Sequence, residues 1–371
     1  MTTRVKILSL RIFIDFGKSL SENESELTSL ILSFLSLLSK TTSLRIEVSS
    51  ESIAFFSIIF RTVATSPLAR TLQRLCVLGY SAMFASQLEY SAYTFENLAD
   101  LSITLWDSEL PGLLEGTFPL SLLAPTLQTL HIATNWSGIL DIFASFNTLD
   151  PSVPFPNLKF LHLFFASTST VPFSKSLLQS FHRLILAHNN NLQDLYVSNV
   201  TLIPNLVADE WLGAWLAELV NNNTQFPSLE ELQLYPSDTR TGLSALLTLI
   251  QRTVPTLSSL TIFDRYLTSE EVNQLLDVLA GGGVLVQTMA TGLIRNKRQS
   301  KLKALIVHIT QLSVPLLDLL ARKLPQLESL SLFVSEIVGS EQVRYFFFPN
   351  FNSTNSAATD YVLRSSPPQT V

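Results

Sequence analysis

The sequence predicts an α/β solenoid, in which parallel strands line the concave side and helices cover the convex side. Three observations lead to this fold class. A short leucine motif recurs along the chain, helix-like stretches lie between its copies, and a proline precedes several copies at one fixed distance. No single copy can bury its own leucines, so neighbouring copies must stack to form a continuous core. Most of the 371-residue chain is therefore expected to form one elongated repeat array.

The motif is L-x-x-L-x-[L/I/V], and each copy predicts one short strand. Side chains alternate along a strand, so the second leucine and the following apolar residue of a copy share one face. The interval between strong copies runs from 25 residues (Leu302 to Leu327) to 45 residues (Leu257 to Leu302). The strong copies begin at Leu72, Leu98, Leu127, Leu158, Leu192, Leu229, Leu257, Leu302 and Leu327, and weaker copies lie at Ile7 and around Leu44.

Helices are predicted between the strands, because apolar residues recur there at helical spacing. The clearest of these stretches are 21–38, 242–254, 268–283 and 313–324. Thr268 and Glu271 have the spacing of a capping box at the start of the third. A proline two residues before the first strand leucine ends a helix and favours extended structure in the residue before it. Prolines at this position are Pro125, Pro156, Pro227, Pro255 and Pro325.

The repeats are expected to fill residues 1–348 with about ten or eleven irregular units. The Ser/Asn/Pro-rich residues 349–371 are predicted to be a disordered tail. The run 295–303 falls in the longest interval and is expected to form a basic loop. It could bind an acidic partner or act as a nuclear address, or it could be an ordinary solvated loop. Its charged residues are Arg295, Lys297, Arg298, Lys301 and Lys303.

Composition and missing motifs argue against several classes of function. The net charge of −6 disfavours binding to nucleic acid or anionic lipid. The uncharged stretch 27–39 is too short to span a membrane. The chain has a single cysteine, Cys76, and charged residues interrupt its first apolar run. The expected location of the protein is therefore the cytoplasm, with the nucleus as the alternative. The common hydrolase, P-loop, zinc-protease and C-x-x-C motifs do not occur, so neither an enzyme nor a cofactor is expected.

The repeat pattern resembles that of leucine-rich repeat proteins over roughly residues 5–340. The FPNL start at 155–158 and the FPSL start at 226–229 are similar to the repeat half of fungal F-box/leucine-rich-repeat proteins. In that family an N-terminal F-box docks the adaptor of a ubiquitin ligase, and the repeats hold the substrate. No F-box helix bundle precedes these repeats, so the resemblance implies a substrate-recognition subunit that lacks its F-box. The alternative is an enzyme regulator, either an inhibitor or a GTPase activator, that binds through the concave face.

The concave face is predicted to consist of the strand residues that alternate with the leucines. Outward aromatic side chains indicate a contact patch for a protein partner. The alternatives are that aromatics merely suit strands, or that a terminal segment covers them. Outward positions also include His308 and Phe333. The predicted partner-binding residues are His131, Phe160, His162, Phe164, Asp194, Tyr196, Tyr235, Phe263, Arg11, Arg45 and Arg74.

Charge and histidine positions add further expectations. Arg11, Arg45 and Arg74 would give the N-terminal part of this face a positive edge. Its middle would be acidic because of Asp100, Asp194 and Glu231. The alternative is that these residues are ordinary solvated surface charges. A metal is not expected at His131 and His162, because no third ligand has suitable spacing. His182 and His188 are interpreted as polar residues of a helix face, with His188 near the C-terminal end of the helix.

The beginning of the chain raises a separate expectation about partners. The first strand starts almost at Met1 with the apolar run ILSLRIFI, and a repeat array needs a polar cap at each end. An upstream segment, a ubiquitin-ligase adaptor or another partner, or self-association is therefore expected at this end.

Overall fold

The computed structural model describes most of the repeat array. The described residues are 7–12, 29–30, 33–34, 41–48, 62–80, 95–106, 126–135, 155–167, 175–201, 211–234, 240–281 and 300–337. Eleven strands form one sheet in chain order, and every neighbouring pair is parallel. The strands are β1 (Ile7–Ile12), β2 (Ser43–Val48), β3 (Arg74–Tyr80), β4 (Asp100–Trp106), β5 (Thr129–Asn135), β6 (Phe160–Ser167), β7 (Asp194–Thr201), β8 (Glu231–Leu234), β9 (Ser259–Leu267), β10 (Ala304–Leu312) and β11 (Ser329–Ile337).

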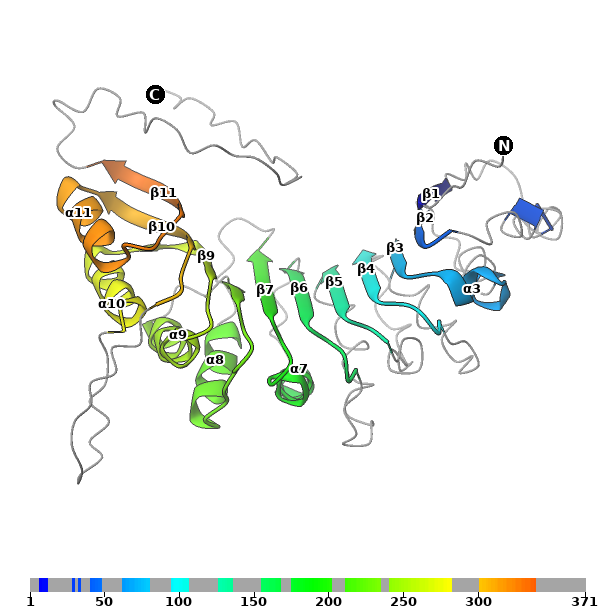
Figure 1. Ribbon diagram of the computed structural model, residues 1–371, viewed down its shortest axis with the longest axis horizontal. Helices are drawn as coiled ribbons and strands as arrows, with labels where there is room; N and C mark the ends of the chain where they lie inside the picture. The colour runs from blue at the N-terminus through cyan, green and yellow to red at the C-terminus, as the bar shows by residue number, and fades with distance from the viewer. Residues whose placement is uncertain are drawn as a thin grey trace.

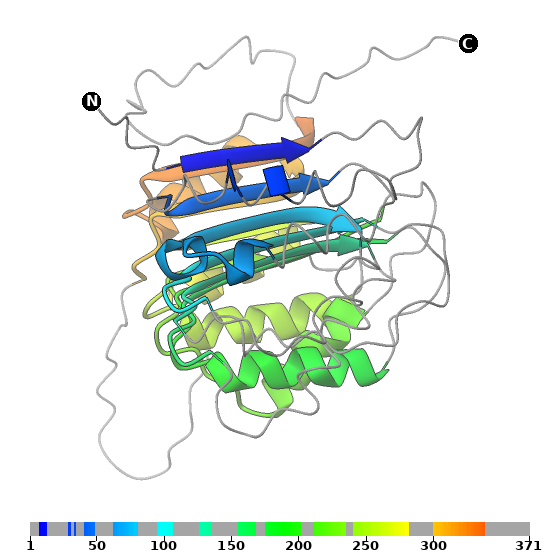
Figure 2. The ribbon, with the colours of Figure 1, turned by 90° about the vertical axis from the view of Figure 1, so that its right-hand side faces the viewer.

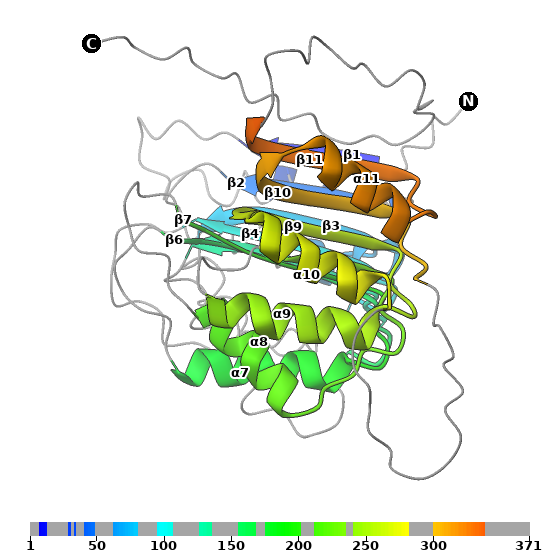
Figure 3. The same cartoon turned by 90° about the vertical axis from the view of Figure 1, so that its left-hand side faces the viewer.

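The sheet curves into an open arc, with the strands on its inner side and the helices on its outer side (Figure 1). The view from one end of the arc shows the N-terminal strands stacked in order (Figure 2). The view from the other end shows the C-terminal helices following one another along the outside (Figure 3). The predicted α/β architecture of parallel strands flanked by helices is confirmed at this level. The helices are α3 (Leu68–Thr71), α7 (Lys175–His188), α8 (Trp211–Asn221), α9 (Arg240–Thr253), α10 (Ser269–Leu279) and α11 (Val314–Lys323).

The core follows the leucine motif strand by strand. The second motif leucine lies in register with its counterparts in neighbouring strands, as Leu161 does with Leu130 and Leu195. From β2 to β10 this ladder is at most 3% exposed, so the alternation predicted from the motif is confirmed. Burying each leucine contributes about 2 kcal/mol relative to leaving it in water. The buried ladder is Leu44, Leu75, Leu101, Leu130, Leu161, Leu195, Leu232, Leu260 and Leu305.

A turn of constant design leads into several strands. Phe155 and Phe226 are buried, and each accepts a hydrogen bond at its carbonyl oxygen from the backbone N–H of the first motif leucine, 3.1 Å from Leu158 and 3.3 Å from Leu229. The prolines that follow the two phenylalanines are exposed and lie within the turn. In the F-P-x-L sequence, the phenylalanine side chain is therefore buried in the core on one side of the turn, and the hydrogen bond fixes the chain direction at the start of the strand.

Backbone hydrogen bonds repeat from one such turn to the next. Two successive N–H groups, those of Gln193 and Asp194, donate to the carbonyl oxygen of Lys159 at 2.8 and 3.1 Å. The next turn repeats this pattern, because Glu230 and Glu231 donate to the carbonyl oxygen of Gln193 at 2.8 and 2.9 Å. The shared acceptor holds consecutive turns in one register, and the strands start level with one another.

Several predicted helix boundaries are confirmed. Helices α9 and α11 end two residues before Pro255 and Pro325, as the proline spacing predicts. Helix α10 begins after Thr268 with the predicted capping box, and Gly281, just past its C-cap, has a φ of 73° that favours glycine. Of the predicted helix 21–38, residues 29–30 and 33–34 are helical, and the rest lies outside the described residues. Pro125 and residues 349–371 lie outside them as well.

Candidate protein-binding face

The inner face consists of the strand residues that alternate with the buried leucine ladder. Parallel pairing aligns them in rows that run across the strands. One row passes through Thr129, Phe160, Asp194 and Glu231, the next through His131, His162, Tyr196 and Gln233, and a third through Ala133, Phe164 and Ser198. Phe160, His162, Phe164 and Tyr196 are partly exposed, whereas Ser198 is buried.

Three rings of the second row lie side by side and form what we call the histidine–tyrosine row: His131, His162 and Tyr196. The ring centroids of the two histidines are 6.0 Å apart in an edge-to-face arrangement. The centroids of His162 and Tyr196 are 5.8 Å apart. Burial lowers the pKa of His131, and the neighbouring His162 lowers it further, against an opposing effect of Asp100. The row offers planar ring surfaces, which suit stacking against a partner.

Asp194 and Glu231 lie side by side at the start of β7 and β8. Asp194 is only 8% exposed, and its Oδ2 accepts a hydrogen bond from Nε2 of His162 at 2.8 Å. Burial raises the pKa of Glu231, and so does the negative charge of Asp194, while His162 acts in the opposite direction. A cation placed beside the two carboxylates would relieve this repulsion.

Two of the three predicted arginines lie near carboxylates. The Nη2 atom of Arg45 is 3.6 Å from Oε2 of Glu47 on the same strand, and Nε of Arg74 is 2.7 Å from Oδ2 of Asp100 on the next strand. Arg11 lies in β1, in register with Glu47. The positive charge of Arg45 and Arg74 is thus balanced locally, and these pairs are best described as charge pairs along the N-terminal strands.

Four rings gather on the inner face at the C-terminal end of the sheet, and we call them the aromatic cluster: Phe263, Tyr266, His308 and Phe333. His308 lies in the middle, with ring centroids 5.3 Å from Phe263, 5.3 Å from Tyr266 and 4.7 Å from Phe333. Tyr266 is 49% exposed and Phe333 48% exposed. Phe263 was predicted as a partner-binding residue, and His308 and Phe333 as outward positions, whereas Tyr266 escaped prediction.

Tyr266 reaches the cluster through a bulge in β9. Ile262 pairs with Val307, but the next residue of β10, His308, pairs with Tyr266, so residues 263–265 are extra in the ladder. A bulge re-aims the residues that follow it. The bulge is defined by pairing with a strand far along the chain, and the sequence around Tyr266 carries no local signal for it.

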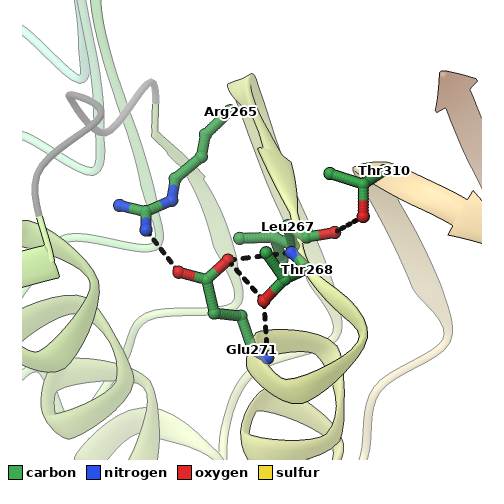
Figure 4. A network of polar contacts seen from close by, with 5 residues as sticks. All are labelled: Arg265, Leu267, Thr268, Glu271 and Thr310. Carbon is green, nitrogen blue, oxygen red and sulfur yellow. Dashed lines mark hydrogen bonds and ion pairs between the residues drawn. The ribbon is translucent and has the colours of Figure 1, made fainter.

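A partly buried polar network holds the bulge against α10 (Figure 4). Arg265, which is buried, forms an ion pair with Glu271. The other carboxylate oxygen of Glu271 accepts from the N–H of Thr268 at 2.8 Å, and Oγ1 of Thr310 donates to the carbonyl oxygen of Leu267 at 3.2 Å. Burial alone would raise the pKa of Glu271, but the N–H of Thr268 and the charge of Arg265 outweigh it, and the pKa is lowered.

Several predicted site residues cannot be assigned to the inner face. Tyr235, Arg295, Lys297 and Arg298 lie outside the described residues. Lys301 is exposed and lies three residues before β10.

The interpretation of His182 and His188 as polar residues of a helix face is wrong. His188 is fully buried in the last turn of α7 and stacks on Phe155, with ring centroids 6.0 Å apart. Burial lowers its pKa to about 4, so it is neutral at pH 7 and brings no positive charge to the end of the helix. His182 is also buried, and its Nε2 accepts a hydrogen bond from Nδ2 of Asn222 at 3.0 Å. The leucine motif identifies strand residues but gives no information on which helix positions are buried.

Within the described part of the chain, no three or more His, Cys, Asp or Glu side chains are grouped so that they could hold a metal ion. None of the helices described is both long and apolar enough to cross a membrane. Comparison with protein-family models found no match, and comparison with curated protein sequences also found none.

Proposed function

We propose that this chain is a protein-binding scaffold of the leucine-rich repeat class that holds a partner protein on its inner face. The observation that carries the proposal is the combination of a buried leucine ladder with partly exposed aromatic and imidazole rings on the alternate positions of the same strands. Aromatic side chains are common anchors of protein interfaces, because they bury a large area at a small entropic cost. The curved sheet would place several such anchors around one partner.

Within this class, our leading hypothesis is a substrate-recognition subunit of the F-box ubiquitin-ligase type. The F-P-x-L turns and the long, helix-bearing repeats support it through their resemblance to that family. A pull-down with the ligase adaptor tests the hypothesis directly. Failure of the full chain to bind the adaptor would remove the ubiquitin-ligase role while leaving the scaffold proposal in place.

An enzyme regulator is the second candidate, favoured by the adjacent carboxylates of Asp194 and Glu231 on the inner face. A negatively charged concave face could clamp a basic enzyme. Adding the purified chain to an assay of a captured partner enzyme tests this candidate. Binding that leaves the reaction rate unchanged would count against it.

The scaffold proposal itself is tested by comparing two sets of substitutions. The inner-face variant replaces Phe160, His162 and Tyr196 with serine. The control replaces Leu186 and Val314, exposed apolar residues of the outer helices α7 and α11, with serine. Partners captured by crosslinking in cells should be lost from the inner-face variant and kept by the control. If both variants retain the same partners, the inner face is not the binding surface.

A further inference from the structure

The inner-face strand positions that the structure describes from β5 to β11 carry carboxylates but no lysine or arginine, and the one basic side chain bonded to these carboxylates among them is His162. Among the inner-face positions of these strands whose side chains the structure describes, Asp194 and Glu231 are the only aspartate or glutamate residues, and neither lysine nor arginine occurs. Arg265, at the bulge of β9, is buried and paired with Glu271. The situation differs at β2 to β4, where Arg45 and Arg74 lie close to carboxylates.

The aromatic cluster lies on the same face, on β9, β10 and β11. Its two exposed rings, Tyr266 and Phe333, flank His308. Rings of this kind attract a lysine or arginine side chain through the cation–π interaction, and they also pack against its aliphatic stem. Carboxylates and exposed rings on one sheet face thus favour the same kind of side chain.

We propose that the inner face between β7 and β11 binds a partner segment rich in lysine and arginine. One basic side chain would lie beside Asp194 and Glu231, and another would lie against Tyr266 and Phe333. This inference rests on the proposed function and specifies the chemistry of the partner. The negative charge of the face opposes the phosphates of nucleic acids and of anionic lipids, so the partner is a basic protein segment.

The test uses the purified full chain and a library of random nine-residue peptides. Peptides retained by the chain should be enriched in lysine and arginine relative to the starting library. The affinity of one enriched peptide is then measured by fluorescence anisotropy at low and high salt. We expect binding to weaken as salt rises, because exposed charges are screened.

Charge variants locate the binding surface. Glu231→Gln alone leaves the hydrogen bond between Asp194 and His162 in place, and the pair Asp194→Asn with Glu231→Gln removes both carboxylates. The matched control, Glu270→Gln with Asp318→Asn, changes the net charge equally at exposed positions on α10 and α11. We expect the inner-face pair to weaken binding about tenfold and the control to have little effect. Tyr266→Ser with Phe333→Ser should weaken it by a similar factor.

Three outcomes would overturn the inference. The first is that the retained peptides are not enriched in basic residues, or that the inner-face charge variants bind them as tightly as wild type does. The scaffold proposal would still stand in that case, because the crosslinking comparison tests it separately. The second is that the control pair Glu270→Gln with Asp318→Asn weakens binding as much as the inner-face pair, which would mean that net charge and not the inner face decides binding. The third is that no peptide is retained at all.

Discussion

His188 is a buried titratable residue whose surroundings link stability to pH. Its ring stacks on Phe155, and its pKa in the folded protein is about 4. An unfolded chain would protonate this histidine near pH 6.5. The unfolded state therefore binds the proton more readily. The contribution of His188 to stability is complete above about pH 6.5 and decreases as the pH falls towards 4.

Replacing His188 with phenylalanine should remove this part of the pH dependence. From the two pKa values, wild type should lose about 2 kcal/mol through His188 between pH 7 and pH 5. Urea unfolding of wild type and His188→Phe at both pH values measures the difference. Phe155→Leu is the control, because it should destabilise by about 1 kcal/mol at both pH values and keep the pH dependence. An unchanged pH dependence in His188→Phe would contradict a buried neutral histidine.

At the scale of elements, the junction of β9 and α10 combines a helix cap with a partly buried ion pair. Glu271 belongs to both, because one carboxylate oxygen pairs with Arg265 and the other accepts from Thr268. The junction fixes the bulge that brings Tyr266 next to His308. Stability at this junction should therefore depend on charge as well as on capping.

A double-mutant cycle separates the two contributions. Glutamine also serves in a capping box, so Glu271→Gln removes the charge and retains the cap. Arg265→Met should destabilise by about 3 kcal/mol, because it leaves a partly buried carboxylate without its cation. The variant with both Arg265→Met and Glu271→Gln should be about 1 to 2 kcal/mol more stable than the sum of the two single losses predicts. Thr268→Ala should lower the free energy of unfolding by about 1 kcal/mol, because it removes the cap. Additive losses in urea unfolding would argue against coupling between Arg265 and Glu271.

The same junction shows which features could be predicted from the sequence. The capping box was predictable, because Thr268 and Glu271 are three residues apart and the signal is local. The alternation of buried and inner-face residues was predictable, because the leucine motif fixes it within each strand. The bulge was not, since it depends on how β9 pairs with β10 across residues 268–303. Tyr266 was therefore missed, whereas His131, His162 and Tyr196, which the motif places on the inner face, lie in one row.

At the scale of the whole molecule, the described strands form a one-dimensional array, in which each of them pairs only with its neighbours in sequence order. The stability of such an array is approximately a sum over repeats and their interfaces. An inner strand has a covering neighbour on each side, whereas β11 is an edge strand of the described sheet. Leu330 of β11 is 39% exposed, although its counterpart Leu195 in β7 is fully buried.

Identical substitutions at these two positions should therefore have unequal effects. Leu195→Ala leaves a cavity in the middle of the core and should destabilise the protein by about 3 kcal/mol. Leu330→Ala should destabilise it by less than about 1 kcal/mol, because part of the Leu330 side chain is already in water. Urea unfolding followed by circular dichroism compares the two variants. Equal losses would mean that another surface covers β11 in solution. Light scattering would then distinguish a second copy of the chain from a covering within one copy, because only the former doubles the mass and depends on concentration.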